Sequence, residues 1–377
     1  MSNPSSNSSL QETILGQDDD LSTNSITSST GSSRQQHKTL KLWPLAVLVF
    51  YNVSGGPFGI EGSIRGAGNF YAILGFMLFP FVWAIPEALV TAELGSAFLD
   101  ASAGVAWVEE AFGPNMGGLC GYLGWISGAT DNALYPTLFL EYLRSIAGDQ
   151  EDSGWLNHFM LVSGITIALA FLNYRGLEIV GNTSLVVCLI AMSPFVLMTI
   201  IGAPQVVPSR WFQMPERSHD GSDLFDDYFQ TNRPLAILNL GGISWRAYLN
   251  NMFWNLNSFD SAASFAPETT DMRVYSNGIF IGLGMSILFY VVPLMIAVGA
   301  TDYTQQEWID GHLGAVAVDI GGKWLGALTV FAAGISNLAL FEAKLSADSF
   351  QLMVRVFWHL TFMITSVFLH ISHTGHG

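Results

Sequence analysis

Apolar stretches of about 20 residues recur along the chain, and each is long enough to cross the hydrocarbon core of a bilayer as an α-helix. Half of the 377 residues are hydrophobic and only 12% are charged, which is too little charge to coat a soluble globule of this size. The sequence therefore predicts an all-α membrane protein. The predicted spans begin at roughly Leu42, Phe70, Met116, Leu156, Leu177, Tyr248, Tyr275 and Trp324, with a ninth from about Leu352 to Ile371.

Polar segments divide these spans into groups. Residues 1–40 are rich in Ser, Asn, Thr and Gln and contain little that can form a core, so we expect a disordered tail. Arg34, Lys38 and Lys41 precede the first span and favour a cytoplasmic N-terminus. A polar stretch over residues 204–245 predicts an extracellular or lumenal loop. It separates about five spans in residues 41–203 from three or four in residues 246–377.

Composition and motifs exclude several function classes. The net charge of −16 argues against a nucleic-acid surface and towards cationic ligands. No phosphate-binding lysine loop is present, which argues against an ATP-driven pump. We find no metal triad, no nucleophile with a base and no cofactor loop, so we expect no enzyme, no metal and no cofactor. His370, His373 and His376 are interpreted as a polar tail, and Cys120 and Cys188 as buried thiols.

The first span contains an interruption with the sequence "VSGGPFGIE". Gly55, Gly56, Pro57 and Gly59 all weaken a helix, by about 1 kcal/mol for glycine and about 3 for proline relative to alanine. Interruption at membrane depth is tolerated only where the freed backbone groups are buried in protein or line a wet cavity. We therefore predict an unwound segment here, the alternatives being a kink or an early helix end.

A second interruption lies in the sixth span, "WRAYLNNMFWNLNSFDSAASFAPE", where polar residues from Asn250 to Ser261 interrupt an apolar segment. Interrupted helices at corresponding positions of two halves indicate an inverted-repeat transporter with a site near the bilayer midplane. Half-helix N-termini attract anions, whereas exposed carbonyls and C-terminal ends attract cations. Such a site suits either a zwitterion or an organic amine.

Several carboxylates fall within or beside predicted spans, where an ionised acid costs about 2.5 to 3.5 kcal/mol. We interpret Glu87, Asp131 and Asp260 as functional, because excess negative charge inside a membrane favours a cationic ligand. Glu61 follows the first interruption, and its residue pattern leaves a functional and a structural interpretation open.

Two further carboxylates are interpreted as structural. Glu93 and Glu342 lie towards predicted helix ends, and Lys344 is close to Glu342 in the sequence.

Aromatic and amide side chains accompany the carboxylates. Tyr135 follows Asp131 by four residues, and Asn255 follows Asn251 by four, so each pair shares a helix face. The rings of Tyr135, Trp254 and Phe259 suit cation–π contact with an ammonium group, although aromatic residues in membrane helices more often serve packing.

Four motifs, "VSGGPFGIE", "FPFVWAIPEALVTAEL", "NNMFWNLNSFDSAASFAPE" and "LFEAKLSADSFQL", closely resemble the polyamine uptake transporters of plants and protists, within the amino acid–polyamine–organocation superfamily. The likeness runs from about Leu42 to Leu352. It implies a leucine-transporter-type fold, in which two inverted five-helix repeats alternate access to a site between the broken first and sixth helices. Transport in such relatives is proton-coupled.

Carried onto this sequence, the resemblance places the breaks at Ser54–Gly59 and Trp254–Ser261, with Glu61, Glu87 and Asp260 in matching motifs; Asp131 departs from the asparagine that is usual there. Glu87 is our candidate for proton coupling. The residues that we expect to contact substrate are Ser54, Gly55, Gly56, Gly59, Glu61, Glu87, Asp131, Tyr135, Trp254, Asn255, Phe259 and Asp260.

The expected function is secondary active transport of polyamines such as putrescine or spermidine. The expected partners are an organic cation or amino acid, protons and the lipid bilayer, in the plasma membrane or an endomembrane. The alternatives are an amino-acid transporter of the same fold and a non-transporting truncated membrane protein. The C-terminal sequence "MVRVFWHLTFMITSVFLHISHTGHG" no longer resembles the family. We therefore expect an incomplete second repeat, from a truncated or mis-spliced gene model.

Overall fold

The computed structural model describes residues 40–147, 155–215 and 240–374, with side chains up to residue 144 in the first range and 351 in the last. Within these ranges the chain is helical, apart from turns and one isolated bridge between Leu40 and Thr269. The expected all-α class is confirmed for this part of the chain. Most of the predicted tail, the middle of the predicted 204–245 loop and the side chains of His370 and His373 lie outside the described residues, as does all of His376.

The helices follow the predicted spans, with two breaks and several short turns. The α-helices are α1 Leu42–Val53, α2 Glu61–Phe79, α3 Ile85–Ala97, α4 Gly104–Phe112, α5 Pro114–Ala147, α6 Trp155–Tyr174, α7 Leu177–Gly202, α9 Trp245–Leu256, α10 Met272–Ala300, α11 Leu313–Gly321 and α12 Lys323–Thr374. A π-turn, Pro80–Ala84, joins α2 to α3, and a 3₁₀ helix, η6 Phe259–Glu268, follows α9.

Five helical segments of the described chain are long and apolar enough to cross a membrane. They are Glu61–Ala97, Trp155–Tyr174, Leu177–Gln205, Met272–Ala300 and Lys323–Gln351. Helix α1 is equally apolar but has only 12 residues, because the break ends it. Helix α5 has 34 residues and carries polar groups such as Asp131 in its middle. The predicted multi-pass membrane protein is thereby confirmed.

Two boundaries differ from the prediction. The second span, expected from Phe70, is part of a helical segment that begins at Glu61 and continues through the π-turn to Ala97. Gly68, with φ 72°, kinks this segment without ending it, and a Cβ there would lie 2.8 Å from Pro215 Cα. The ninth span, expected over 352–371, lies in the same unbroken helix as the eighth, α12.

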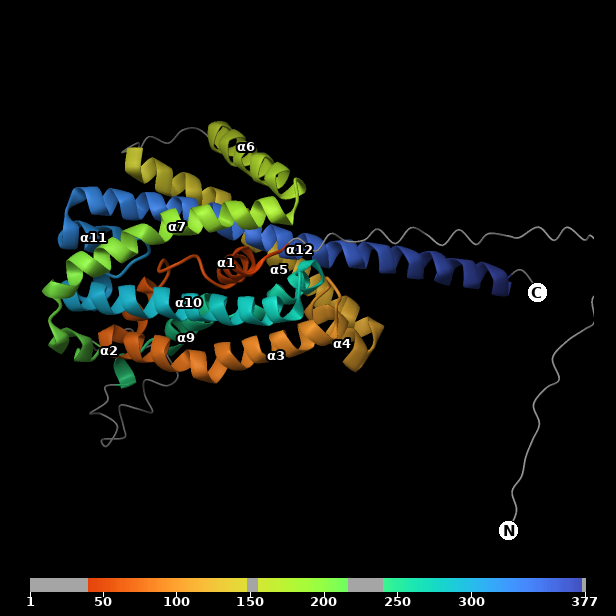
Figure 1. The fold of residues 1–377 in the computed structure, drawn as a ribbon, viewed down its shortest axis with the longest axis horizontal. Coiled ribbons are helices and arrows are strands. Elements are labelled where there is room, and N and C mark those ends of the chain that lie inside the picture. Colours follow the sequence, from red (N-terminus) through yellow and green to blue (C-terminus); the bar gives the residue numbers. More distant parts are fainter. Residues whose placement is uncertain (1–39, 148–154, 216–239, 375–377) are drawn as a thin grey trace, which may run out of the picture. The chain divides into compact units, whose positions relative to one another are not determined.

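Helix α1 lies at the centre of the packing. It contacts α7, α10 and α12, and Figure 1 shows it between α7 and α10. Leu45, Leu48, Phe50 and Tyr51 of α1 are fully buried. Helix α6, at the margin of the packed helices in Figure 1, has no buried residue. The first break therefore emerges in the protein interior, away from the peripheral helix.

The two broken helices run antiparallel. Helix α1, before the first break, packs against η6, which follows the second break. Helix α2, after the first break, packs against α9, which precedes the second. Because the half-helix before each break packs against the half-helix after the other, the two breaks lie at the same level of the protein. Two helices related by an inverted repeat have this arrangement.

Candidate functional site

The first break covers residues 54–60, between α1 and α2. Gly56 and Gly59 have φ angles of 89° and 91°, a left-handed conformation that side chains with a Cβ disfavour. A Cβ on Gly56 would also lie 2.5 Å from Met192 Cε. The Ser54 hydroxyl accepts a hydrogen bond from the Gly56 amide at 3.1 Å. The predicted unwound segment is confirmed, and its glycines are required by backbone geometry.

The second break is confirmed but is narrower than the expected Trp254–Ser261. Helix α9 ends at Leu256, Asn257 is extended, and Ser258 is left-handed with φ 80°. The 3₁₀ helix η6 starts at Phe259, so Trp254 lies within α9. The break therefore consists of two residues, one extended and one left-handed, between α9 and η6.

Carboxamides of α9 bind the backbone of the first break. Asn251 Nδ2 donates to the Gly59 carbonyl at 2.7 Å, and Asn255 Nδ2 approaches the same oxygen at 3.4 Å. The Ser63 hydroxyl donates to Asn251 Oδ1. One helix thereby fixes the unwound backbone of the other at the level where both are interrupted.

Glu61 binds backbone amides on the α2 side of the first break. Its Oε2 accepts from the Gly59 amide at 2.8 Å, and its Oε1 lies 3.4 Å from the Leu313 amide, at the start of α11. The residue is only 1% exposed. Its carboxyl group lies at the N-terminal end of α2, where the helix dipole favours a negative charge.

Glu87 of α3 has the equivalent position at the second break. Its Oε1 accepts from the Ser258 amide at 3.0 Å and lies 3.4 Å from the Asp260 amide. Its Oε2 is buried and has no hydrogen-bond partner among the described residues. At each break, a glutamate carboxylate thus accepts a hydrogen bond from a backbone amide that precedes the following half-helix.

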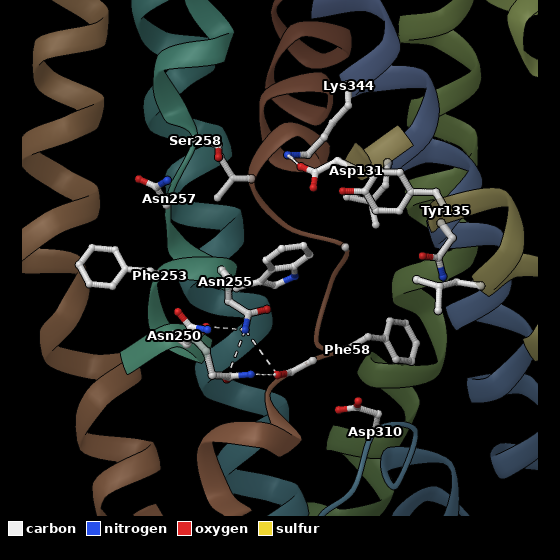
Figure 2. Close-up of a pocket in the computed structure, with 18 of the residues that line it drawn as sticks. Phe58, Asp131, Tyr135, Asn250, Phe253, Asn255, Asn257, Ser258, Asp310 and Lys344 are labelled. Atoms are coloured by element: carbon white, nitrogen blue, oxygen red, sulfur yellow. Dashed lines mark hydrogen bonds and ion pairs between the residues drawn. The ribbon is translucent and has the colours of Figure 1, made fainter. Parts of the chain in front are cut away.

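A cavity of about 720 Å³ lies between the two breaks, α5 and α12 (Figure 2). Its wall combines amide groups, aromatic rings and three charged side chains. The lining residues are Val53, Gly55, Phe58, Gly59, Ser127, Asp131, Tyr135, Leu138, Tyr142, Ala247, Asn250, Asn251, Phe253, Trp254, Asn255, Asn257, Ser258, Tyr290, Asp310, Gly311, Asn337, Leu340 and Lys344.

The three charged residues in the lining are Asp131, Lys344 and Asp310. Lys344 Nζ lies 3.1 Å from Asp131 Oδ2, and the two side chains are 18% and 21% exposed. Figure 2 shows Asp310 at the opposite end of the cavity from this pair. Asp310 makes no side-chain hydrogen bond or ion pair within the described part of the chain. The cavity therefore has one paired and one unpaired carboxylate.

A second polar contact joins α5 to α12 beside the ion pair. Asn132 Nδ2 donates to Asp348 Oδ2 at 2.7 Å. A Cβ on Gly128 would lie 2.3 Å from the same oxygen, so a larger residue there would displace the Asp348 carboxylate.

Six of the predicted site residues line the cavity: Gly55, Gly59, Asp131, Tyr135, Trp254 and Asn255. The other six, Ser54, Gly56, Glu61, Glu87, Phe259 and Asp260, lie outside its lining. Ser54 and Phe259 are fully buried, and the two glutamates bind backbone amides as described above. Asp260 is exposed on the side of α4, where a Cβ on Gly104 would lie 3.7 Å from its Oδ2.

Lys344, which is close to Glu342 in the sequence, does not pair with it. Residues two apart on a helix face different directions, and Lys344 points to Asp131 instead. Glu342 is buried and lies 3.4 Å from Asn173 Nδ2 of α6. Glu93, also interpreted as structural, is exposed on α3. Cys188 is buried as expected, whereas Cys120 is only half-buried.

Sequence reasoning missed Asp310, Tyr142 and Asn337 of the lining. Tyr142 follows Tyr135 by seven residues, a spacing that keeps both on one helix face and that a search for cavity rings could have used. Asp310 gave no signal, because it lies in a polar connection between two predicted spans. No group of three potential metal ligands occurs among the described residues.

Asp310 belongs to the lid segment, defined here as residues 301–322, which contains α11. Burial lowers the pKa of His312 below its usual range, opposed by the nearby Glu307 and Asp319. Hydrogen bonds from Thr304 hold the pKa of Glu307 below its usual range. The lid segment therefore presents net negative charge, which attracts cations to this end of the cavity.

Comparison with known proteins supports the resemblance drawn from the motifs. The profile of the amino acid permease family matches residues 40–343. A probable polyamine transporter of Arabidopsis thaliana is 38% identical over 329 residues, 87% of this chain and 61% of the relative. A second Arabidopsis protein, a polyamine transporter, is 39% identical over 319 residues, 84% of this chain and 60% of the relative.

A polyamine transporter of Oryza sativa subsp. japonica is 38% identical over 317 residues, which are 84% of this chain and 55% of the relative. The chain thus spans between 55% and 62% of the length of the curated relatives that it matches.

Proposed function

The chain belongs to the amino acid permease family, and from this premise we propose that it is a secondary active transporter of polyamines such as putrescine or spermidine. Membership implies a leucine-transporter-type fold with two inverted five-helix repeats. Helices α1 to α7 fit the first repeat, and α9 to α12 fit the first part of the second. Alternating access to the cavity between the breaks would then move the substrate.

One observation carries the choice of an organic cation over an amino acid. The amides of Gly56, Gly59 and Ser258, at the two breaks, already donate to side-chain oxygens of the protein itself. A broken-helix site holds the carboxylate of an amino acid with free amides at the N-terminal ends of its half-helices. Here Ser54, Glu61 and Glu87 occupy those donors, so a substrate without a carboxylate fits better.

The cavity offers acceptors and rings that suit ammonium groups. Asp131 already holds the ammonium group of Lys344 at 3.1 Å, which is the contact that a substrate amine would make. Tyr135 and Trp254 line the same cavity and suit cation–π contact with an ammonium group. The apolar side chains of Leu138 and Leu340 are suited to the methylene chain between two amines.

Glu87 is our candidate for the proton-coupling residue. Its Oε1 holds the amides of the second break, while its buried Oε2 has no partner in the described part of the chain. A proton on Oε2 would remove the negative charge beside Asp260 without removing the acceptor that holds the break. Protonation would thereby change the electrostatics of the site while the backbone stays in place.

Orientation and membrane are part of the proposal. A cytoplasmic N-terminus makes α1 run outward, which puts the lid segment on the extracellular or lumenal side. We assign the protein to the plasma membrane, with an endomembrane as the alternative.

Uptake of radiolabelled spermidine into proteoliposomes tests the function. We expect uptake above that of protein-free liposomes. In Asp131→Asn we expect the KM for spermidine to rise about tenfold or more, because the substrate ammonium group loses its carboxylate partner and the unpaired Lys344 repels it. Glu93→Gln is the matched control, since it neutralises an exposed carboxylate of α3 away from the cavity, and it should transport normally. Absence of uptake despite a folded protein would favour the non-transporting alternative.

An amino-acid substrate remains the second candidate, because the matching family is that of amino acid permeases. Inhibition of spermidine uptake by arginine or leucine at concentrations near the spermidine KM would favour it.

A further inference from the structure

We propose that Asp310 is a second ammonium-binding residue of the cavity, and that a substrate bridging Asp131 and Asp310 connects the occupied site to the lid segment. This inference rests on the proposed polyamine transport. It adds a residue that sets the preference for cations with two separated amines over those with one.

The carboxylates of the lid segment differ in whether they have partners. Asp302 pairs with Arg210 at 3.7 Å, Glu307 accepts from Thr304 at 2.7 Å, and Asp319 accepts from the Tyr303 hydroxyl at 2.5 Å. Asp310 is the only one of the four acidic residues in 301–322 that lacks a side-chain partner within the described chain. It is also the only one that lines the cavity. Its carboxylate is thus available to a ligand.

Asp131 shows how the other end of the cavity holds an ammonium group. The Lys344 ammonium has the same chemistry as a substrate amine, and it lies 3.1 Å from Asp131 Oδ2. Figure 2 shows Asp131 and Asp310 at opposite ends, with Phe58 at a level between them. A cation with amines at both ends of an apolar chain matches this order of charged, apolar and charged groups. A monoamine can satisfy only one end.

Contacts of the lid segment connect the residues around Asp310 to the first break. Trp308 is 1% exposed and its ring lies 5.1 Å from that of His312, which in turn lies 4.3 Å from the ring of Tyr303. Trp308 and His312, two residues before and after Asp310, are thus packed together, whereas Asp310 itself is exposed. Three residues further on, the Leu313 amide lies 3.4 Å from Glu61 Oε1. An ammonium group on Asp310 would thus tie the substrate to the segment that bonds with Glu61.

The test compares a diamine with a monoamine of the same carbon chain in Asp310→Asn. We expect the concentration of 1,4-diaminobutane that halves spermidine uptake to rise about fivefold, while that of n-butylamine stays unchanged, because only the diamine has a second ammonium group for Asp310 to bind. Asp319→Asn is the matched control. It neutralises another carboxylate of the lid segment, keeps an oxygen for Tyr303 and lies outside the cavity lining, so both concentrations should stay as in the wild type.

The outcomes separate this inference from the proposed function. If the wild type takes up spermidine but Asp310→Asn leaves the diamine-to-monoamine ratio unchanged, the role of Asp310 is overturned and polyamine transport stands. An equal loss in Asp310→Asn and Asp319→Asn also overturns it, since general attraction by the lid charge would then explain the effect. If the wild type takes up no amine, the proposed function fails and the inference fails with it.

Discussion

Glu87 illustrates how a carboxylate at membrane depth acts through the backbone. It accepts from the amide of Ser258, a residue with a left-handed φ of 80°. Because a buried amide without an acceptor costs about 1–3 kcal/mol, the carboxylate stabilises a conformation that would otherwise revert to helix. Glu61 does the same for Gly59 at the first break.

Two substitutions of Glu87 separate its structural role from its proposed proton role. Glu87→Gln keeps an oxygen acceptor, so we expect nearly wild-type thermal stability but loss of the acceleration of uptake by an inward proton gradient. Glu87→Ala removes the acceptor and should lower stability by about 1–3 kcal/mol. Thermal unfolding in detergent and uptake with and without a pH gradient provide the two readouts. Proton-driven uptake that persists in Glu87→Gln would exclude this residue as the coupling site.

Some of these residue roles could be predicted from the sequence and others could not. The glycines and proline of the first break have local preferences that do not depend on the rest of the fold, so the sequence was sufficient there. The target of Glu87 is an amide 171 residues away, and the partner of Asp131 is 213 residues away. Such pairings depend on which helices become neighbours, and no local pattern encodes that.

At the scale of elements, the contact between α5 and α12 forms one wall of the cavity. The Asp131–Lys344 pair and the Asn132–Asp348 hydrogen bond join the two helices on consecutive turns of α12. If this wall stabilises the fold as well as binding substrate, substitutions of Asp131 and Lys344 should have non-additive effects on the free energy of unfolding.

A double-mutant cycle tests that coupling. Lys344→Met leaves Asp131 without its cation, and Asp131→Asn leaves Lys344 without its anion, so each should destabilise the protein. The double variant should recover part of the loss, with a coupling of about 1–2 kcal/mol, less than for a fully buried pair because both side chains are partly exposed. Thermal unfolding of the four proteins measures it. Additive losses would show that the pair contributes no stability of its own.

The contact between Glu61 and α11 gives a second element-scale prediction. Glu61→Gln removes the charge that holds the Leu313 amide, so we expect faster hydrogen exchange in peptides that cover residues 310–318. Exchange in α10, which makes no hydrogen bond with the Glu61 side chain among the described residues, serves as the internal reference, and Glu93→Gln is the control variant. Unchanged exchange in the lid segment of Glu61→Gln would remove the proposed link between the first break and α11.

Element positions were predictable where hydrophobic length decides them. The helices from α5 to α10 begin within a few residues of the predicted starts, because the start of a largely apolar stretch marks each of them in the sequence. The continuous segment from Glu61 to Ala97 was not predictable, since Gly68 bends it without a turn signal. The narrow second break was also unexpected, because a run of polar residues from Asn250 to Ser261 looks like a longer interruption than the two residues that carry it.

At the scale of the molecule, the account depends on how the two broken helices meet. In the antiparallel pair, the amides of Gly56, Gly59 and Ser258 at the two breaks donate to side-chain oxygens of the protein, while carboxylates and rings line one cavity. We propose that an interior of this kind selects positive charge and offers little to a carboxylate. This selectivity is the central claim.

Competition between putrescine and ornithine tests it most directly, because ornithine is putrescine with a carboxylate added to one terminal carbon. The two compounds are compared as inhibitors of radiolabelled spermidine uptake into proteoliposomes. We predict that putrescine inhibits at least tenfold more strongly, since ornithine brings an anion for which the amides at the two breaks are already occupied. Equal or stronger inhibition by ornithine would contradict the claim and identify the cavity as an amino-acid site.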